Sequence, residues 1–273
     1  MQPQEALLYP ELPSGPTAPN GAEPTYWVGP RHLAGDDGRL YDTVADTLSG
    51  IGWTNLALIR GRKQPDEDQQ VLRSTVLHIS PDGLRWAQWV LADEPFLLGG
   101  LPIAWQVSAR TDNSSPIGKW SAYFTPGVPG EALADFLLAL DAHDQPTTSW
   151  AGPERVLDAA TAHGWRRATD RPHTAAADPT ATGRLAYSEM PPLIQDADPH
   201  TLATEADQTR PAGWQAWSQP TPNGACLWAA SFSHGVPHDL VATFAASLTT
   251  STPVLRRVLP DSTKGRLLGA PAD

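Results

Sequence analysis

A stretch of 21 residues occurs twice in this chain and constrains its fold more than any other feature. Residues 120–140, WSAYFTPGVPGEALADFLLAL, return without a gap as residues 228–248, WAASFSHGVPHDLVATFAASL, with nine identical positions. In each copy, alternating apolar residues predict a strand, Gly-Val-Pro predicts a turn, and apolar residues three and four apart predict a helix. The same strand, turn and helix are therefore encoded twice.

The residues upstream of each copy also correspond. An apolar stripe over 40–51 predicts a helix in the first half, and residues 153–160 predict its counterpart. Each helix is followed by Gly-Trp, a pattern typical of a helix end and a strand start. Strand-forming residues over 71–92 surround a Ser-Pro-Asp-Gly turn and predict a hairpin. We expect an α+β protein of two tandem repeats, each a curved antiparallel sheet of four to five strands flanked by an N-terminal and a C-terminal helix.

The repeat sets the expected domain boundaries. We expect a proline-rich disordered tail over 1–25, a first repeat over 26–146, a second repeat over 147–259 and a C-terminal tail over 260–273. The second repeat is degenerate, because residues 168–183 and 191–212 have little periodicity and many turn formers.

The predicted core takes its aromatic residues from the inward strand faces and the apolar helix stripes. They are Trp53, Trp105, Trp120, Phe124, Phe136, Trp165, Trp214, Trp228, Phe232 and Phe244.

Composition narrows the classes of function. The net charge of −11 argues against general affinity for phosphate backbones or anionic membranes. Cys226 is the single cysteine, which excludes an internal disulfide and a cysteine-rich metal site. The sequence contains neither a signal-peptide pattern nor an apolar run of membrane-spanning length. We therefore expect a cytoplasmic protein that does not bind membranes.

Several motifs together carry a family resemblance: Pro30-Arg31-His32-Leu33-Ala34-Gly35, Gly52-Trp53, Ser80-Pro81-Asp82-Gly83, the Trp105 strand and the 120–140 unit. In this order and spacing they resemble the actinobacterial SPDY family, domain-of-unknown-function family 317, which often occurs as two tandem copies. The resemblance covers residues 27–140 well and residues 150–248 more loosely. Gly83 stands where the family name implies tyrosine. The resemblance implies a fold unit and an actinobacterial origin, and it carries over no activity and no catalytic residue.

The sequence offers weak candidates for catalysis or metal binding. His234 and His238 have the four-residue spacing of a metal-binding helix, but Pro237 lies between them after a turn. The chain contains neither Gly-x-Ser-x-Gly nor a glycine-rich phosphate loop, and Cys226 is expected to be a buried thiol. We expect no enzyme, no metal and no cofactor; an enzyme whose active site is assembled from scattered residues is the third alternative.

Binding of a macromolecule is the leading hypothesis. The candidate binding residues are three tryptophans without a counterpart in the other copy and a small basic group: Trp86, Trp89, Trp217, Arg60, Arg62 and Lys63. Trp86 and Trp89 fall on opposite faces of their predicted strand. Tryptophan is enriched in interface hot spots, which favours a protein partner engaged through sheet faces and loops. The alternative is single-stranded nucleic acid held on an aromatic and arginine-bearing sheet face, and an enzyme is third.

Overall fold

The computed structural model describes residues 25–63, 70–90, 97–115, 118–188, 213–221, 224–263 and 265–271. The α-helices of this described part are α1 (Arg31–Ala34), α2 (Leu40–Gly50), α3 (Gly130–Asp141), α4 (Glu154–Thr161) and α7 (His238–Thr249), and a 3-10 turn, η1, spans Asp261–Thr263. The strands are β1 (Tyr26–Gly29), β2 (Thr54–Lys63), β3 (Gln70–Ile79), β4 (Arg85–Trp89), β5 (Leu97–Leu98), β6 (Leu101–Pro102), β7 (Trp105–Ala109), β8 (Trp120–Phe124), β9 (Arg166–Arg167), β10 (Ala175–Ala177), β11 (Gly183–Ser188), β12 (Gly213–Ser218), β13 (Trp228–Ser233), β14 (Val254–Arg256) and β15 (Leu268–Pro271). Among the helices described, none is long and apolar enough to span a membrane.

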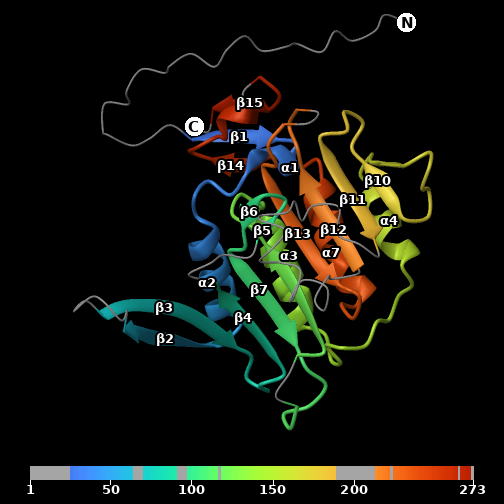
Figure 1. Cartoon of the computed structure of the whole chain (residues 1–273). Coiled ribbons are helices and arrows are strands. Elements are labelled where there is room, and N and C mark those ends of the chain that lie inside the picture. Colours follow the sequence, from blue (N-terminus) through green and yellow to red (C-terminus); the bar gives the residue numbers. More distant parts are fainter. Residues whose placement is uncertain are drawn as a thin grey trace, which may run out of the picture.

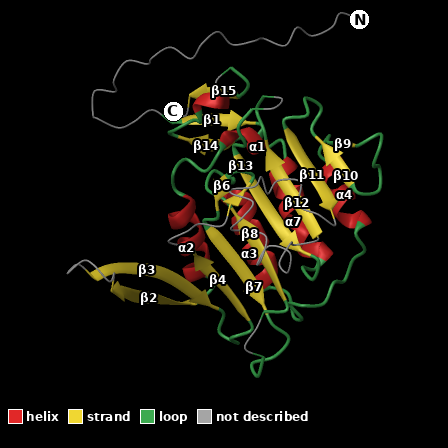
Figure 2. Ribbon diagram, in the orientation of Figure 1, coloured by secondary structure: helices red, strands yellow, loops and turns green. Residues whose placement is uncertain are grey.

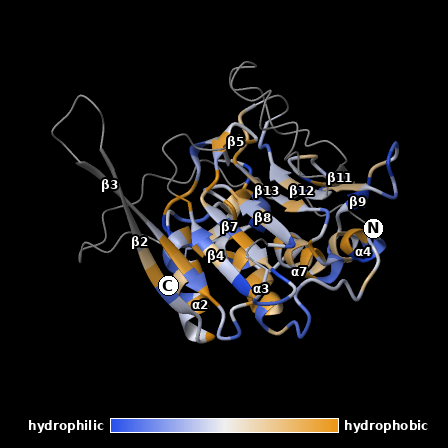
Figure 3. Cartoon of the chain, turned by 60° about the horizontal axis from the view of Figure 1, so that its bottom comes forward, coloured by the Kyte–Doolittle hydropathy of each residue, from blue (hydrophilic) through white to orange (hydrophobic). Residues whose placement is uncertain are grey.

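A ten-stranded antiparallel sheet forms the centre of the molecule, in the order β2-β3-β4-β7-β8-β13-β12-β11-β10-β9 (Figure 1). The α+β class predicted from the sequence is confirmed. The two separate sheets that we expected are instead joined edge to edge, through β8 and β13. The helices α2, α3, α7 and α4 lie side by side on one face of the sheet (Figures 2 and 3), and the opposite face is free of them.

The junction between β8 and β13 has a symmetric register. The paired residues are Ala122 with Phe232, Tyr123 with Ser231 and Phe124 with Ala230. Tyr123 and Ser231 occupy the same position of the duplicated stretch. Exchanging the two copies therefore turns the Ala122–Phe232 pair into the Ala230–Phe124 pair and leaves the register unchanged. A local two-fold axis therefore passes between Tyr123 and Ser231.

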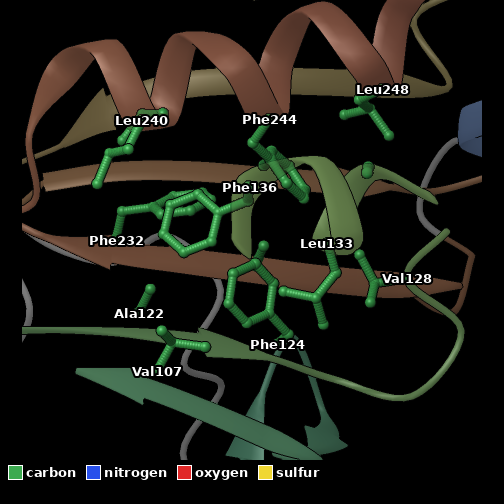
Figure 4. Packing of buried hydrophobic residues seen from close by; sticks show 14 of the residues in the cluster. Val107, Ala122, Phe124, Val128, Leu133, Phe136, Phe232, Leu240, Phe244 and Leu248 are labelled. Carbon is green, nitrogen blue, oxygen red and sulfur yellow. The ribbon is translucent and has the colours of Figure 1, made fainter. Parts of the chain in front are cut away.

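Four phenylalanines fill the core beneath this junction (Figure 4). Phe124 and Phe232 come from the paired strands, and Phe136 and Phe244 come from α3 and α7. Their ring centroids lie 5.2 to 5.8 Å apart, in edge-on and tilted contacts. Such pairs each add about 0.5–1.5 kcal/mol beyond the burial of their area. The ten aromatic residues of the predicted core are all at most 5% exposed.

The core tryptophans also hold distant segments through their indole N–H groups. Trp53 donates to the Asp141 carboxylate at 2.6 Å, at the end of α3. Trp120 donates to the carbonyl of Pro146, and Trp228 donates to the carbonyl of His32, both at 2.8 Å. Buried indole N–H groups usually find an acceptor, and these three bonds connect the sheet and helices to the loops that surround them.

The predicted Ser-Pro-Asp-Gly turn joins β3 to β4. The Ser80 hydroxyl donates to Asp82 at 2.6 Å, and the Gly83 N–H donates to the Ser80 carbonyl at 2.9 Å. Gly83 has φ +70°, and a Cβ there would lie 3.0 Å from the Asn113 side chain. This backbone conformation explains why glycine stands at the position.

A small second sheet ties the two ends of the described chain together. Its order is β14-β1-β15, so residues 26–29 pair with residues 254–256 and 268–271 (Figure 1). Part of the expected C-terminal tail is thus a strand. Arg256 of β14 makes a bidentate ion pair with Glu131 of α3 at 2.6 and 2.7 Å, which fastens this sheet to the helical layer.

His32 of α1 packs against the second half and is almost fully buried. Its Nε2 lies 3.1 Å from the Thr182 hydroxyl and 3.8 Å from the Asp178 carboxylate. Burial lowers the pKa of His32 from its usual 6.5 to about 4, although the Asp178 charge opposes this shift. At neutral pH the histidine is therefore uncharged, and its contact with Asp178 is polar rather than ionic.

This pKa predicts a loss of stability in acid. The folded-state pKa of His32 is below its unfolded value, so its contribution is fully present above pH 6.5 and disappears as the pH falls towards about 4. The loss amounts to about 3 kcal/mol. We expect His32→Gln to flatten this part of the pH profile, measured by urea unfolding. His173→Gln, at an exposed position, is the control. Identical profiles for His32→Gln and the parent would contradict the assignment.

Candidate interaction surface

The two tryptophans of β4 point to opposite faces of the sheet. Trp89 lies on the helix-covered face, where its ring is 5.3 Å from both Tyr41 of α2 and Trp105 of β7. Trp86 lies on the helix-free face and is partly exposed. The guanidinium carbon of Arg110 lies 5.9 Å from the centroid of the Trp86 ring, within the range of a cation–π contact. Trp89 is thus part of the core, whereas Trp86 remains available on the surface.

Apolar residues from the neighbouring strands surround Trp86. Ile79 of β3 is its cross-strand partner, and Leu77 of β3 pairs with Leu56 of β2. Leu56 is 46% exposed, and Leu77 and Ile79 are partly exposed. We call Leu56, Leu77, Ile79 and Trp86 the β2–β4 patch. It is a partly exposed apolar area on the helix-free face, and Arg110 lies beside its tryptophan.

Beyond this patch, β2 and β3 leave the rest of the sheet. They pair with each other from Thr54 and Ile79 to Lys63 and Gln70, but β3 pairs with β4 only over residues 77–79. Residues 57–63 and 70–76 therefore form a two-stranded arm that projects from the body (Figure 1), which we call the β2–β3 arm.

The predicted basic group lies in this arm. Arg60, Arg62 and Lys63 belong to β2, and Arg60 is opposite Arg73 of β3. Their side chains lie outside the described part of the structure. At about 3.3 Å per residue, Arg60 is roughly 20 Å along the strand from the level of Trp86. The basic group therefore belongs to the β2–β3 hairpin, whereas Trp86 belongs to the next strand, β4.

Trp217 lies in the other half of the sheet and is only 8% exposed. It packs with Leu98 and Ala229 in a second apolar cluster on the helix-free face. The β5–β6 hairpin covers this cluster, and its turn is so close that a Cβ on Gly99 would lie 3.2 Å from the sulfur of Cys226. Burial raises the pKa of the Cys226 thiol to about 11. Trp217 and Cys226 are therefore packed residues beneath a hairpin that the sequence did not predict.

The middle of the helix-free face is polar. Ser108 and Ser121 are hydrogen bonded at 2.8 Å, and the Gln106 amide lies 3.4 Å from both hydroxyls. Gln215 and its cross-strand partner Ser231 are buried, and their side-chain polar atoms have no hydrogen-bond partner. At the described strand positions of this face, no aspartate or glutamate occurs, although the chain carries a net charge of −11.

The two histidines of the metal hypothesis have separate partners. The Tyr187 hydroxyl lies 2.7 Å from His234 Nδ1, and the Trp214 indole donates to His238 Nδ1 at 3.2 Å. Burial lowers the pKa of His238, with a smaller contribution from His234. Within the described residues, no group of three or more His, Cys, Asp or Glu side chains could hold a metal ion.

His143 and Asp239 form the clearest acid–base pair, with His143 Nε2 2.8 Å from the carboxylate. The Ser149 hydroxyl donates to the Ala151 carbonyl at 2.8 Å and has no bond to His143. Trp150 covers the histidine ring at 3.7 Å. A serine nucleophile would need a hydrogen bond to the histidine. The contacts of His143, Ser149 and Trp150 instead attach the segment between α3 and α4 to Asp239 of α7.

One protein-family model matches two segments of the chain, residues 79–147 and 195–254. The family is SPDY, a domain of unknown function (DUF317). The two matched segments are similar to SPDY and are consistent with tandem copies of that domain. The resemblance predicted from the sequence is confirmed for these segments, whereas residues 27–78 lie outside the first match. Neither the curated proteins nor the solved structures contain a match to the chain.

The bounds of the two matches show which surface features lie inside the SPDY-like segments and which lie outside them. The first match begins at Ile79, so it contains Trp86 and the β5–β6 hairpin but not Leu56 or the β2–β3 arm. The second contains β12, β13 and α7, and its residues 195–212 lie outside the described part. The arm is therefore an extension upstream of the matched SPDY segment.

The cover over Cys226 can be tested by its reactivity. We expect the thiol to react slowly with a disulfide reagent at mildly alkaline pH, because it is buried and its pKa is raised. Leu98→Ser should loosen the β5–β6 hairpin and increase the rate about tenfold or more, as local opening exposes the sulfur. Leu138→Ser, an exposed position on α3, is the control. Equal rates in the parent and in Leu98→Ser would show that the hairpin does not protect the thiol.

Proposed function

We propose that this protein is a non-catalytic binding protein that engages another protein through the helix-free face of its first half and the β2–β3 arm. The observation that carries the proposal is the β2–β4 patch, where Leu56 is 46% exposed and Trp86 is partly exposed on the same face. A tryptophan surrounded by aliphatic side chains is a typical anchor of a protein interface.

We infer that each half of the sheet is one copy of the ancestral repeat. The first copy would comprise β2, β3, β4, β7 and β8 with α2 and α3, and the second β9 to β13 with α4 and α7. The mirrored register of β8 and β13 and the two SPDY matches support this division. Each copy is then a five-stranded antiparallel sheet flanked by an N-terminal and a C-terminal helix.

Differences between the two halves favour the first as the binding half. In the second half, the β5–β6 hairpin covers Trp217 and Ala229 on the helix-free face. The β2–β4 patch in the first half is more exposed, since Leu56 is 46% exposed and Leu77, Ile79 and Trp86 are partly exposed. The outermost strands also differ, because β2 has ten residues and β9 has two. Isolated two-stranded hairpins are marginally stable in water, so a partner that packs against the arm would stabilise it.

Single-stranded nucleic acid is the second candidate. The contact between Arg110 and Trp86 favours it, because an indole with an adjacent guanidinium can stack a base and neutralise its phosphate. The lack of carboxylates at the described strand positions of this face also supports an anionic ligand. The protein partner is preferred, because the neighbours of Trp86 on β2 and β3 are aliphatic.

Substitutions in the patch test the proposal. We expect Leu56→Lys and Trp86→Ser to lose most of the partner protein that the parent captures from native lysate, because each removes apolar contact area. Leu138→Lys is a matched control, since Leu138 of α3 is 44% exposed and lies on the opposite, helical side. Circular dichroism and thermal unfolding confirm that the variants are folded.

The lysate is divided and one part is treated with nuclease. Capture that survives the nuclease and depends on Leu56 and Trp86 supports a protein partner. Capture that disappears with the nuclease, together with salt-sensitive binding of a single-stranded oligonucleotide, would transfer the function to the second candidate. Retention of the same partner by both patch variants would refute the proposed face.

A further inference from the structure

The two outermost strands of the large sheet differ in how their free edges are protected. At one end, β9 has only two residues, and its Arg167 is tied to α4 through Asp158 at 2.8 Å and Glu154 at 3.3 Å. At the other end, β2 has ten residues, pairs with β3 on one side only, and contains no proline. A long edge strand presents a row of unpaired backbone N–H and C=O groups to any extended chain.

The described side chains of β2 are uncovered on both faces of the sheet. Thr54, Asn55, Leu56 and Ala57 are successive residues, so they alternate between the two faces, and all four are exposed. Within the described residues, neither a helix nor a loop therefore covers the side chains at the start of β2. An incoming strand could pair with it without displacing another element.

The composition of the hairpin indicates the charge of its partner. The residues of β2 and β3 include the four basic side chains Arg60, Arg62, Lys63 and Arg73 and no aspartate or glutamate, in a chain of net charge −11. Pairing β2 with β2 of a second copy would bring like charges together, which is unfavourable in a sheet. An acidic segment would instead complement the arm. The acidic residues 66–68 of the connecting segment lie outside the described residues.

We propose that β2 accepts an extended, acidic segment of a partner protein as an added strand of the ten-stranded sheet. This inference rests on the proposed function and names the partner's chemistry. Backbone hydrogen bonds to the free edge of β2 supply affinity, and alternate side chains of the added strand provide specificity. Carboxylates of the segment neutralise the basic arm, and one end of the added strand lies beside Leu56 of the β2–β4 patch.

A synthetic peptide tests the edge directly. The probe alternates glutamate and valine over the length of β2 and is labelled for fluorescence anisotropy. One control is its all-D enantiomer, which has the same charge and a mirror-image backbone. A second control alternates lysine and valine, and a third is single-stranded oligo-dT. We expect the full-length protein to bind the acidic L-peptide and to protect the β2 amides from hydrogen exchange when it does so.

Charge reversal on β2 supplies the matched variants. The double variant R60E/R62E should weaken binding of the acidic L-peptide about tenfold or more, since two attractive charge pairs are lost and the reversed charges repel the peptide. Arg155→Glu, an exposed position on α4, is the control and should bind as the parent does.

Several results would overturn the proposal: no binding of the acidic L-peptide, equal binding of its enantiomer or of the lysine peptide, or binding without protection of β2. Preferential binding of oligo-dT with the same arginine dependence would assign the arm to nucleic acid instead. The proposed function fails separately, if Trp86→Ser leaves partner capture intact. If Trp86→Ser abolishes capture and R60E/R62E does not, the face is correct and the edge is wrong.

Discussion

The pairing of β8 with β13 is the interaction on which the rest of this structure depends. It converts two edges into the middle of one sheet, and it places Phe124 and Phe232 where both can meet the phenylalanines of α3 and α7. One half alone would expose a central strand edge and half of an aromatic cluster. The two halves of the sheet are therefore one folding unit in physical terms, because their hydrophobic core lies across the boundary between them.

Local periodicity predicted the strands and helices of the duplicated unit, because the spacing of apolar residues shows which face of each element is buried. The period of two also predicted that Trp86 and Trp89 point to opposite faces, and the turn-forming residues predicted the Ser-Pro-Asp-Gly turn. Pairing between distant segments could not be predicted in the same way. The β8–β13 register joins residues 108 positions apart, and β15 joins β1 across most of the chain. Burial of Trp217 depends on the β5–β6 hairpin, whose two-residue strands carry no periodic signal.

The candidate surface follows from departures from the repeat rather than from the repeat itself. Symmetric positions such as Phe136 and Phe244 are committed to the shared core. The β2–β3 arm, the partly exposed β2–β4 patch and the covering hairpin occur once each in the described part. Of the residues proposed from the sequence, Trp86 belongs to the β2–β4 patch and the basic group belongs to the β2–β3 arm. Trp89 packs against the main core and Trp217 packs in the second apolar cluster. On the proposed division into two copies, the shared positions form the core and the differences between the halves form the candidate surface.

The small sheet of β14, β1 and β15 has a consequence for synthesis of the protein. On the ribosome β1 emerges early, but both of its strand partners belong to residues 254–271. The carbonyl of His32 likewise accepts its hydrogen bond from the indole N–H of Trp228, which is synthesised much later. Residues 26–29 can therefore form their native pairs only after residues 254–271 have been made. Until then β1 has neither of these strand partners, so the small sheet closes after the strands of the large sheet have been synthesised.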